Sequence, residues 1–417
     1  MVRDQAMDRN GRAVKVVLAG YNGANNTGSE ARMLSVIADV RSVLGPEAII
    51  TIPTLNESNL RRYITEEETL RIAPIPAIFF FALRRLIREN DLVLLVEGSC
   101  YMDTWAKVLL WAYLSVSKNA SKRGKPCLGY AIDAGTLSER NVRRVRRDAS
   151  RCDLIIVRTQ LAADRLKGWG VTAPITVTDD TAFTFDARPE QRTLARLWPG
   201  AGKVAGMSVV DFHIWPVVVR PFGRGKDCYR WPYYFSRSPE RRERSEELAL
   251  NLAREADRLV EEHGCMVALI AMEALDERLA RSVLERMRNR AEARIFSSNV
   301  HAADVMTRLL RDLHILVTSR YHASVLSMRA GVPQVAIGHD LRLRDMYQES
   351  GLLEEFFLPA SSSDLWPLLR QRVDRLMREH DALKARMLRV HEAHLNRSEE
   401  NVRLLRRFCQ EKGLPVV

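Results

Sequence analysis

The sequence has no long apolar run and no paired cysteines, and both absences limit what the protein can be. The longest apolar stretches, residues 72–83 and 108–116, are shorter than the roughly 20 residues that a membrane-spanning helix needs. The N-terminal residues 1–13 are polar and charged, unlike a secretory signal. The six cysteines are scattered without a CxxC pair, so we expect neither disulfides nor a metal site. These absences predict a cytoplasmic protein.

Recognised nucleic-acid motifs are also missing, although the chain is basic. Its formal net charge of +12 favours anionic partners, which include phosphorylated small molecules, an anionic membrane surface and nucleic acid. The basic runs, such as residues 140–151, lack the regular aromatic residues of a single-strand binder, and no helix-turn-helix or zinc-finger pattern occurs. We therefore expect no nucleic-acid partner. Peripheral contact with the inner face of a membrane remains open.

The length and the order of the predicted elements indicate two α/β domains. A chain of 417 residues exceeds the about 250–300 residues that one core supports. Short buried strands alternate with helices, stop at a Pro- and Gly-containing linker at residues 186–202, and then start again. We predict two Rossmann-like domains facing a cleft, similar to the GT-B glycosyltransferase fold. We place them at residues 1–196 and 197–417, with charged terminal helices that pack back on the first domain.

The first candidate site is the loop GYNGANNTGSE, which follows the predicted strand at residues 13–20. Its glycines permit backbone angles that other residues avoid, and it leads into a helix that starts near Gly28 or Ser29. Backbone amides at a helix start suit an anion or a sugar hydroxyl. The spacing matches neither GxGxxG nor the P-loop. A ligand loop and a tight structural turn capped by Ser29 both fit these residues.

Acidic side chains follow several predicted strands at the sheet edge where α/β proteins bind ligands. Glu97, Ser99 and Asp103 lie at the carboxyl edge of the strand predicted within residues 91–99, and Asp133 lies at the edge of a later one. Asp179 and Asp180 follow a third strand. Glu97 could also be a turn carboxylate paired to a nearby amide or arginine. The shared position favours a functional role.

The segment TSRYHAS contains the strongest candidates. It follows a predicted strand at residues 313–319, so Arg320, Tyr321 and His322 lie at the strand end or the next helix start. Arginine offers a planar fork for carboxylate or phosphate, and histidine can move a proton near neutral pH. A lone histidine is often structural, which is how we interpret His314. His339 ends the next strand and is a further candidate.

An insertion rich in Trp, Tyr, Arg and Pro occupies residues 211–242. Its aromatic residues suit a sugar-binding loop, a surface excursion or a segment that touches a membrane. The sequence does not distinguish these alternatives.

Two of these segments resemble the polysaccharide pyruvyl transferase family. The loop Gly20-Tyr21-Asn22-Gly23-Ala24-Asn25-Asn26-Thr27-Gly28-Ser29-Glu30-Ala31 matches the family pattern after the first strand. Arg320-Tyr321-His322-Ala323, followed by Ala330-Gly331-Val332-Pro333, matches its Arg-x-His-Ala segment. The resemblance covers about residues 13–353. The family's Gly-rich middle loop is altered here to Glu97-Gly98-Ser99, and its Val-Arg-Asp segment to Val157-Arg158-Thr159.

The resemblance implies a transferase that moves a pyruvyl group from phosphoenolpyruvate onto two hydroxyls of a saccharide, forming a cyclic ketal and releasing phosphate. Phosphoenolpyruvate is the donor substrate, and no cofactor or metal is required. Arg320 would hold the donor, and His322 would act as acid or base, with Glu97 or Asp103 in the other role. The substrate-binding candidates are Gly23, Asn26, Thr27, Gly28, Ser29, Glu30, Ser99, Asp133, Asp180, Tyr321 and His339.

Family acceptors are often lipid-linked saccharides of the cell envelope, which agrees with the basic surface. Two alternatives remain open. The chain could be a GT-B glycosyltransferase, with Arg320 on the diphosphate of a nucleotide sugar. It could also be a non-catalytic member that binds a saccharide or phosphoester.

Overall fold

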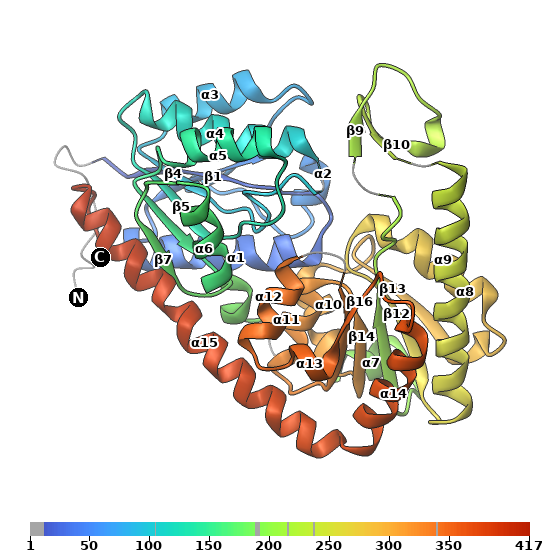
Figure 1. The fold of residues 1–417 in the computed structure, drawn as a ribbon. Helices are drawn as coiled ribbons and strands as arrows, with labels where there is room; N and C mark the ends of the chain where they lie inside the picture. Colours follow the sequence, from blue (N-terminus) through green and yellow to red (C-terminus); the bar gives the residue numbers. More distant parts are fainter. Residues whose placement is uncertain (1–11, 105, 188–191, 215–216, 237, 339–340) are drawn as a thin grey trace. The chain divides into compact units, whose positions relative to one another are not determined.

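The computed structural model describes residues 12–104, 106–187, 192–214, 217–236, 238–338 and 341–417. The chain divides into two compact units, each with its own parallel sheet (Figure 1). Unit 1 contains the described residues up to Ala24, Ser29–Phe185 and His394–Val417, and unit 2 contains Asn25–Gly28 and Asp186–Ala393. The expected α/β class with two Rossmann-like domains is confirmed.

The sheet of unit 1 has seven parallel strands in the order β3-β2-β1-β4-β5-β6-β7. Its strands β4 (LVLL) and β6 (LIIV) consist of Val, Ile and Leu, as expected of a parallel sheet covered on both faces, and all residues of β4 and β5 are buried. The strands are β1 (Lys15–Ala19), β2 (Ile49–Thr54), β3 (Leu70–Pro74), β4 (Leu92–Leu95), β5 (Cys127–Ile132), β6 (Leu154–Val157) and β7 (Ile175–Val177). The helices are α1 (Thr27–Leu44), α2 (Glu57–Leu60), α3 (Phe80–Glu89), α4 (Lys107–Ser121), α5 (Glu139–Ala149) and α6 (Gln160–Gly168), with a 3-10 turn at Thr181–Thr184.

The sheet of unit 2 has six parallel strands in the order β13-β12-β8-β14-β15-β16. These strands are β8 (Val204–Ser208), β12 (Met266–Ala271), β13 (Ala293–Ser297), β14 (Ile315–Thr318), β15 (Gln334–Gly338) and β16 (Phe357–Pro359). The helices are α7 (Thr193–Leu197), α8 (Pro239–Glu261), α9 (Glu277–Arg286), α10 (Ala303–Arg311), α11 (Tyr321–Met328), α12 (Leu341–Glu349), α13 (Leu353–Phe356) and α14 (Leu365–Arg378), with 3-10 turns at Gly225–Asp227, Ala274–Asp276 and Arg290–Glu292.

In both sheets the strand order reverses beside the first strand of the unit. The reversal lies between β1 and β4 in unit 1 and between β8 and β14 in unit 2. Open α/β sheets bind ligands outside the carboxyl ends of the strands at such a switch point. The segments that follow these strands are the Gly- and Asn-rich loop after β1, the Glu97 segment after β4 and Arg320 after β14.

A small antiparallel sheet in the order β10-β11-β9 lies in the chain between β8 and α8, within the insertion at residues 211–242. Its strands are β9 (Val217–Val219), β10 (Cys228–Arg230) and β11 (Tyr233–Phe235). None of the helices that the structure describes is both long enough and apolar enough to span a bilayer.

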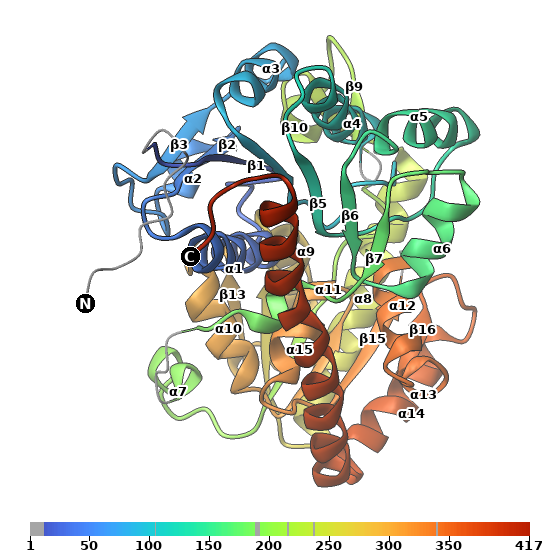
Figure 2. The ribbon, with the colours of Figure 1, turned by 90° about the vertical axis from the view of Figure 1, so that its left-hand side faces the viewer.

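The last helix, α15 (His380–Glu411), contributes to both units, because unit 1 includes its residues from His394 onward. Leu405, Phe408 and Cys409 are buried in the same apolar cluster as residues of α1. Beyond the helix, the Val417 amide donates to the carbonyl of Val43 at 2.9 Å. Figure 2 shows the end of the chain beside α1. The C-terminal segment therefore completes the core around α1.

Candidate functional site

Arg320 and His322 lie at the switch point of unit 2, where β14 leads into α11. Ser319 joins the two central strands at this point, since its amide donates to the Ser208 carbonyl (2.9 Å) and its hydroxyl accepts from the Val210 amide (2.7 Å). Arg320 follows as the residue that caps α11, and its amide donates to the Thr318 hydroxyl at 2.9 Å. The end of β14 is thus hydrogen-bonded to the end of β8, which fixes the start of α11.

The Arg320 guanidinium is held by two buried carboxylates. Its Nε donates to Oδ2 of Asp276 at 2.8 Å, Nη1 donates to Oε2 of Glu273 at 3.0 Å, and Nη2 also pairs with Asp276. Burial raises the pKa of both carboxyls, whereas the charge of Arg320 lowers it. Burial disfavours the charged guanidinium, yet the two carboxylates outweigh that effect and raise the pKa of Arg320. The arginine is therefore rigid and always charged.

The segment Asn25–Gly28 contacts the same cluster. The Asn26 side-chain amide donates to Oε2 of Glu273 at 3.2 Å, and the Thr27 amide donates to the Met272 carbonyl at 2.8 Å. Asn25 adopts a φ of 56°, and its carbonyl accepts from the Ala274 amide at 3.2 Å. Asparagine tolerates this left-handed conformation better than most residues. Glu273 therefore connects the loop to Arg320.

Gly28 lies directly against the imidazole of His322. A Cβ built at position 28 would be 2.1 Å from Nδ1 of His322, closer than any real contact allows. The ring of the buried Tyr321 meets the His322 ring edge-on, with centroids 5.0 Å apart. Since α1 begins at Thr27 and α11 begins at Tyr321, the starts of two helices meet here. Both helix starts carry partial positive charge and amides suited to an anion.

Glu97 and its neighbours organise the switch point of unit 1. The Glu97 carboxylate accepts from the amides of Tyr21 (3.1 Å) and Ser99 (3.0 Å) and from the Ser99 hydroxyl (2.8 Å). It therefore ties the loop after β1 to the loop after β4. Asp103 accepts from the Ser138 amide (3.1 Å) and hydroxyl (2.9 Å) and from Nδ2 of Asn141 (2.8 Å), at the start of α5.

Three other candidates lie in or beside the first turns of α1. Gly23 has a φ of +71°, and a Cβ there would be 2.4 Å from Oγ1 of Thr54, so both the conformation and the space require glycine. The Glu30 carboxylate is buried and accepts from Nδ2 of Asn59 at 3.2 Å. Ser29 is partly exposed in the first turn. Within unit 1, Gly23 and Glu30 thus set the position of the loop and helix.

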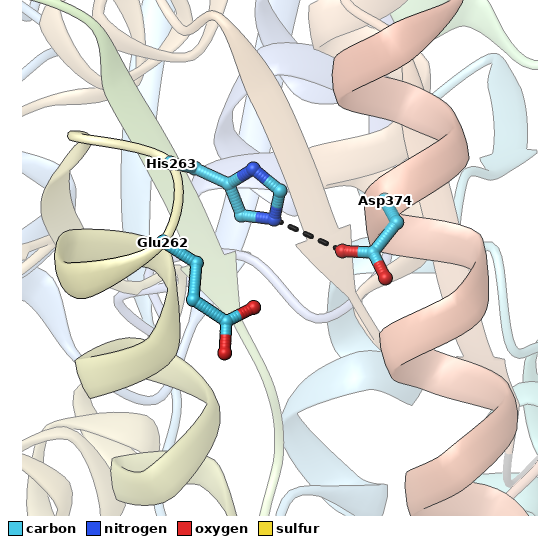
Figure 3. A group of neighbouring side chains, drawn as sticks. All are labelled: Glu262, His263 and Asp374. Carbon is cyan, nitrogen blue, oxygen red and sulfur yellow. Dashed lines mark hydrogen bonds and ion pairs between the residues drawn. The ribbon is translucent and has the colours of Figure 1, made fainter.

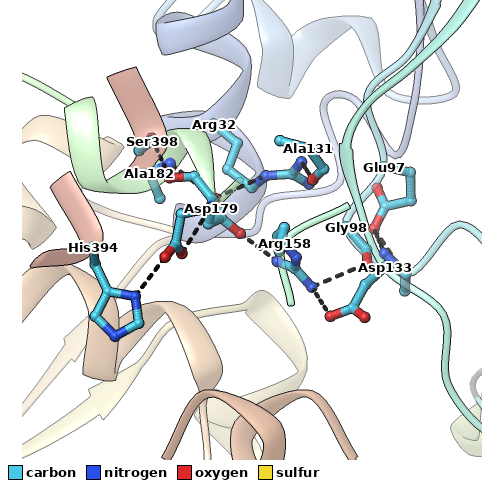
Figure 4. Close-up of polar contacts among 12 residues, drawn as sticks. Arg32, Glu97, Gly98, Ala131, Asp133, Arg158, Asp179, Ala182, His394 and Ser398 are labelled. Carbon is cyan, nitrogen blue, oxygen red and sulfur yellow. Dashed lines mark hydrogen bonds and ion pairs between the residues drawn. The ribbon is translucent and has the colours of Figure 1, made fainter. Parts of the chain in front are cut away.

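Asp133 and Asp180 are buried in an ion-pair network at the same edge of the sheet. Figure 4 shows Asp133 beside Arg158 in this network. Arg158, itself fully buried, pairs with Asp133 at 2.7 Å and with Asp180. Arg32 pairs with Asp180 at 3.1 Å and donates to the Ala131 carbonyl at 2.6 Å. Isolated buried charges are costly, so each charge here depends on its partners. Both aspartates hold strand ends together, and ligand binding by them stays a prediction.

Asp179 has a different partner, the last helix. Its carboxylate accepts from His394 at 2.6 Å and from Arg397 at 2.7 Å, and Figure 4 shows the His394 ring directed at it. The Asp179 carbonyl accepts from Nδ2 of Asn401 at 2.9 Å. These contacts fasten α15 to the end of β7.

Glu262, His263 and Asp374 form a second polar cluster, with ligand atoms within 4.8 Å of one another (Figure 3). Arg258 already lies among them. Its Nη1 is 2.6 Å from Asp374, 3.0 Å from Glu262 and 3.2 Å from Nε2 of His263. A guanidinium in this position repels a metal ion and satisfies the same acceptors, so the cluster is an ion-pair network.

Glu273 and Asp276 are not among the residues predicted from the sequence, although a signal is present there. Both follow the strand β12 in the segment AMEALD, the position that drew attention to Glu97 and Asp133. In contrast, His339 lies outside the described residues.

Solved structures similar to this chain share its fold at low identity. MnaA of S. aureus, solved with UDP, gives a TM-score of 0.60 at 12% identity, covering 96% of this chain and 97% of that one. HepE of Anabaena, solved with UDP and glucose, gives 0.59 at 12%, covering 96% and 99%. The UDP-GlcNAc 2-epimerase of Methanocaldococcus jannaschii gives 0.56 at 11%, covering 94% and 99%. The expected GT-B fold is thereby confirmed.

Sequence comparison gives one family assignment. No curated protein matches the chain significantly. The family model described as polysaccharide pyruvyl transferase matches residues 26–340, about three quarters of the chain.

Proposed function

Because the chain belongs to the polysaccharide pyruvyl transferase family, we propose that it transfers a pyruvyl group from phosphoenolpyruvate to a saccharide. Two hydroxyls of the acceptor would bond to the central carbon of the donor, giving a cyclic ketal and inorganic phosphate. We further propose a lipid-linked saccharide as the acceptor, in a cytoplasmic step of cell-envelope polysaccharide synthesis.

The observation that carries this proposal is the contact between Gly28 and His322. These residues belong to the two motifs that resemble the family, and they are far apart in the chain yet touch in unit 2. Glu273 links the same two motifs through Asn26 and Arg320. Residues 25–28 of the first motif and the second motif therefore form one local structure within unit 2, as a shared substrate site requires.

The local charges suit a donor that carries a carboxylate beside a phosphate. Three of the N–H groups of Arg320 donate to Asp276 and Glu273, and a guanidinium has five. The remaining N–H groups can bind a donor oxygen, together with amides at the starts of α1 and α11. The starts of α1 and α11, which meet beside this cluster, add partial positive charge that favours an anion.

The reaction needs two kinds of proton transfer. A proton added to the methylene carbon makes the central carbon electrophilic, and a saccharide hydroxyl attacks that carbon as a base removes its proton. The phosphate then leaves with the electrons of its C–O bond, and the second hydroxyl closes the ring and loses its proton. We assign one of these transfers to His322. The sequence suggests Glu97 or Asp103 for the other.

The test is phosphate release from phosphoenolpyruvate in the presence of saccharide acceptors, with mass analysis of the product. We expect Arg320→Ala to raise the KM for phosphoenolpyruvate, and His322→Ala to lower kcat by about 10²–10⁴-fold with a smaller change in KM. Arg329→Ala, which removes an exposed arginine just after α11, is the matched control. If His322→Ala keeps the wild-type kcat, the proton-transfer role is wrong.

A second candidate is a nucleotide-sugar reaction, because MnaA and HepE, which share the fold, were solved with UDP. In that case UDP-GlcNAc would raise the melting temperature, whereas phosphoenolpyruvate would not. If a saccharide or phosphoester binds but no donor turns over, the chain is a non-catalytic member of the family.

A further inference from the structure

The small sheet β10-β11-β9 presents large apolar side chains to solvent. Phe222 is 86% exposed, Trp231 60% and Val219 59%. These three residues, which we call the hairpin patch, come from β9 and the turns of a single excursion. Exposed aromatic residues gathered on one protruding element indicate an interaction surface.

The hairpin patch is held in place by the sheet itself. β11 pairs with β9 on one side and β10 on the other. Gly223, next to Phe222, packs so closely on Tyr234 that a Cβ would lie 2.5 Å from its ring. Tyr234 is buried at 7% exposure, so the turn is anchored inward while Phe222 projects outward.

Trp231 is prepared for an apolar environment. Its indole N–H, the one polar group of the side chain, already donates to the Pro221 carbonyl at 3.2 Å. A ring whose donor is satisfied internally can leave water without losing a hydrogen bond. Tryptophan is also a preferred residue at membrane–water interfaces.

The basic residues around the hairpin patch favour an anionic partner. Residues 217–235 contain four basic residues and one aspartate, and Arg220 and Arg224 are exposed. A second copy of this chain, with a net charge of +12, would be repelled. A saccharide binds best in a concave pocket, whereas Phe222 projects from the surface. Arg224 pairs with Asp227 at 3.0 Å, which leaves the surroundings of the exposed apolar side chains basic on balance, and such a surface fits an anionic lipid bilayer.

We propose that this sheet docks the protein on an anionic phospholipid bilayer. Phe222 and Trp231 enter the interfacial region, and Arg220 and Arg224 lie among the headgroups. The inference does not depend on the proposed reaction, because it concerns binding without donor or acceptor.

The test is co-sedimentation of the full chain with vesicles of phosphatidylcholine alone or mixed with phosphatidylglycerol. We expect binding to the mixed vesicles that weakens as salt is added, since salt screens exposed charges. Phe222→Ser combined with Trp231→Ser should bind at least about tenfold more weakly. Val300→Ser, which removes an apolar side chain that is 72% exposed elsewhere in unit 2, should bind as the wild type does. Melting temperatures verify that each variant is folded.

Two results would overturn the proposal. One is equal binding of the double variant and the wild type to the mixed vesicles; if that variant also lost binding to a soluble oligosaccharide, the surface would be a saccharide site. The other is equal binding of the wild type to both kinds of vesicle. Phe81→Ser, at a 78% exposed position in α3, tests another exposed aromatic site, and loss of vesicle binding in that variant alone would transfer the membrane contact to α3.

Discussion

At the residue scale, the site depends on one position that has no room for a side chain. Gly28 lies at the start of α1, and its hydrogen faces the imidazole of His322. Any Cβ would displace the ring or the helix start. The contact between Gly28 and His322 brings the two motifs together, and it leaves no space for a larger residue at position 28.

Gly28→Ala should destabilise unit 2 by about 1–3 kcal/mol, because it overpacks a fixed contact. It should also reduce turnover, since the His322 ring must move. Urea unfolding and phosphate release measure the two effects. Gly168→Ala in α6 is the control, because a Cβ there meets nothing within 4 Å. Equal stability of the two variants would show that the Gly28 contact is not tight.

A pH effect is expected at Asp39. Burial raises the pKa of this carboxyl to about 7, although the Tyr130 hydroxyl donates to it at 2.9 Å and partly lowers the pKa. Between the ordinary value of 3.8 and about 7, the folded state keeps a proton that the unfolded chain has lost. Stability from this group is therefore present at low pH and is lost as pH rises towards 7, at up to about 1.4 kcal/mol per pH unit.

Asp39→Asn should remove this slope and be more stable than the wild type at pH 8. Urea unfolding at pH 5 and pH 8 gives the free energy of unfolding of both proteins. The difference between wild type and variant at each pH isolates the contribution of Asp39 from those of other groups. Parallel pH profiles for the two proteins would contradict the shift.

At the element scale, α15 is attached to unit 1 by buried polar contacts as well as by apolar packing. Asn401 is fully buried, donates to the Asp179 carbonyl at 2.9 Å and accepts from the Thr178 hydroxyl at 2.6 Å. A buried side chain with partners on both its donor and its acceptor fixes the rotation of the helix.

Asn401→Ala should cost about 1–3 kcal/mol, because the Thr178 hydroxyl and the Asp179 carbonyl lose their buried partner. Arg403→Ala, two residues further along on the exposed side of α15, should change stability by less than about 0.5 kcal/mol. Chemical unfolding of both variants measures the difference. If Asn401→Ala lost less stability than Arg403→Ala, water would be replacing the hydrogen bonds of the asparagine side chain.

Among the elements, the parallel strands were predictable because they are short apolar runs between turn residues. β1 and β14, for example, have this pattern. β3 lacks it, because exposed and buried positions are mixed within its sequence LRIAP. The antiparallel strands β9, β10 and β11 are three residues each, too short for a periodic signal, and their pairing depends on residues distant in the insertion.

At the scale of the whole molecule, each unit has its own sheet and core, but the chain passes between units more than once. The sequence indicated the strand ends that hold Arg320, His322 and Glu97, because a strand end is a local feature. It did not indicate that Glu273 and Asp276 neutralise Arg320, because that contact joins residues more than 40 positions apart. It also gave no sign that Asp133 and Asp180 are buried with Arg158.

Removing residues 394–417 should weaken unit 1 selectively, although these residues follow unit 2 in the chain. Leu405, Phe408 and Cys409 would leave a gap in the core around α1, and each large buried side chain contributes about 2–5 kcal/mol. Hydrogen exchange should accelerate at the amides of β1 and much less at those of β8. Equal acceleration in both strands would mean that the two units unfold together.

The placement of His394–Val417 in unit 1 has a consequence for synthesis. Strands β1 to β7 are translated early, yet the core around α1 cannot close until the final turns of α15 have emerged from the ribosome. Unit 2 has nearly all of its chain available before then. The nascent protein is therefore expected to hold its first-made half open longest, so chaperones would encounter that half rather than the later one.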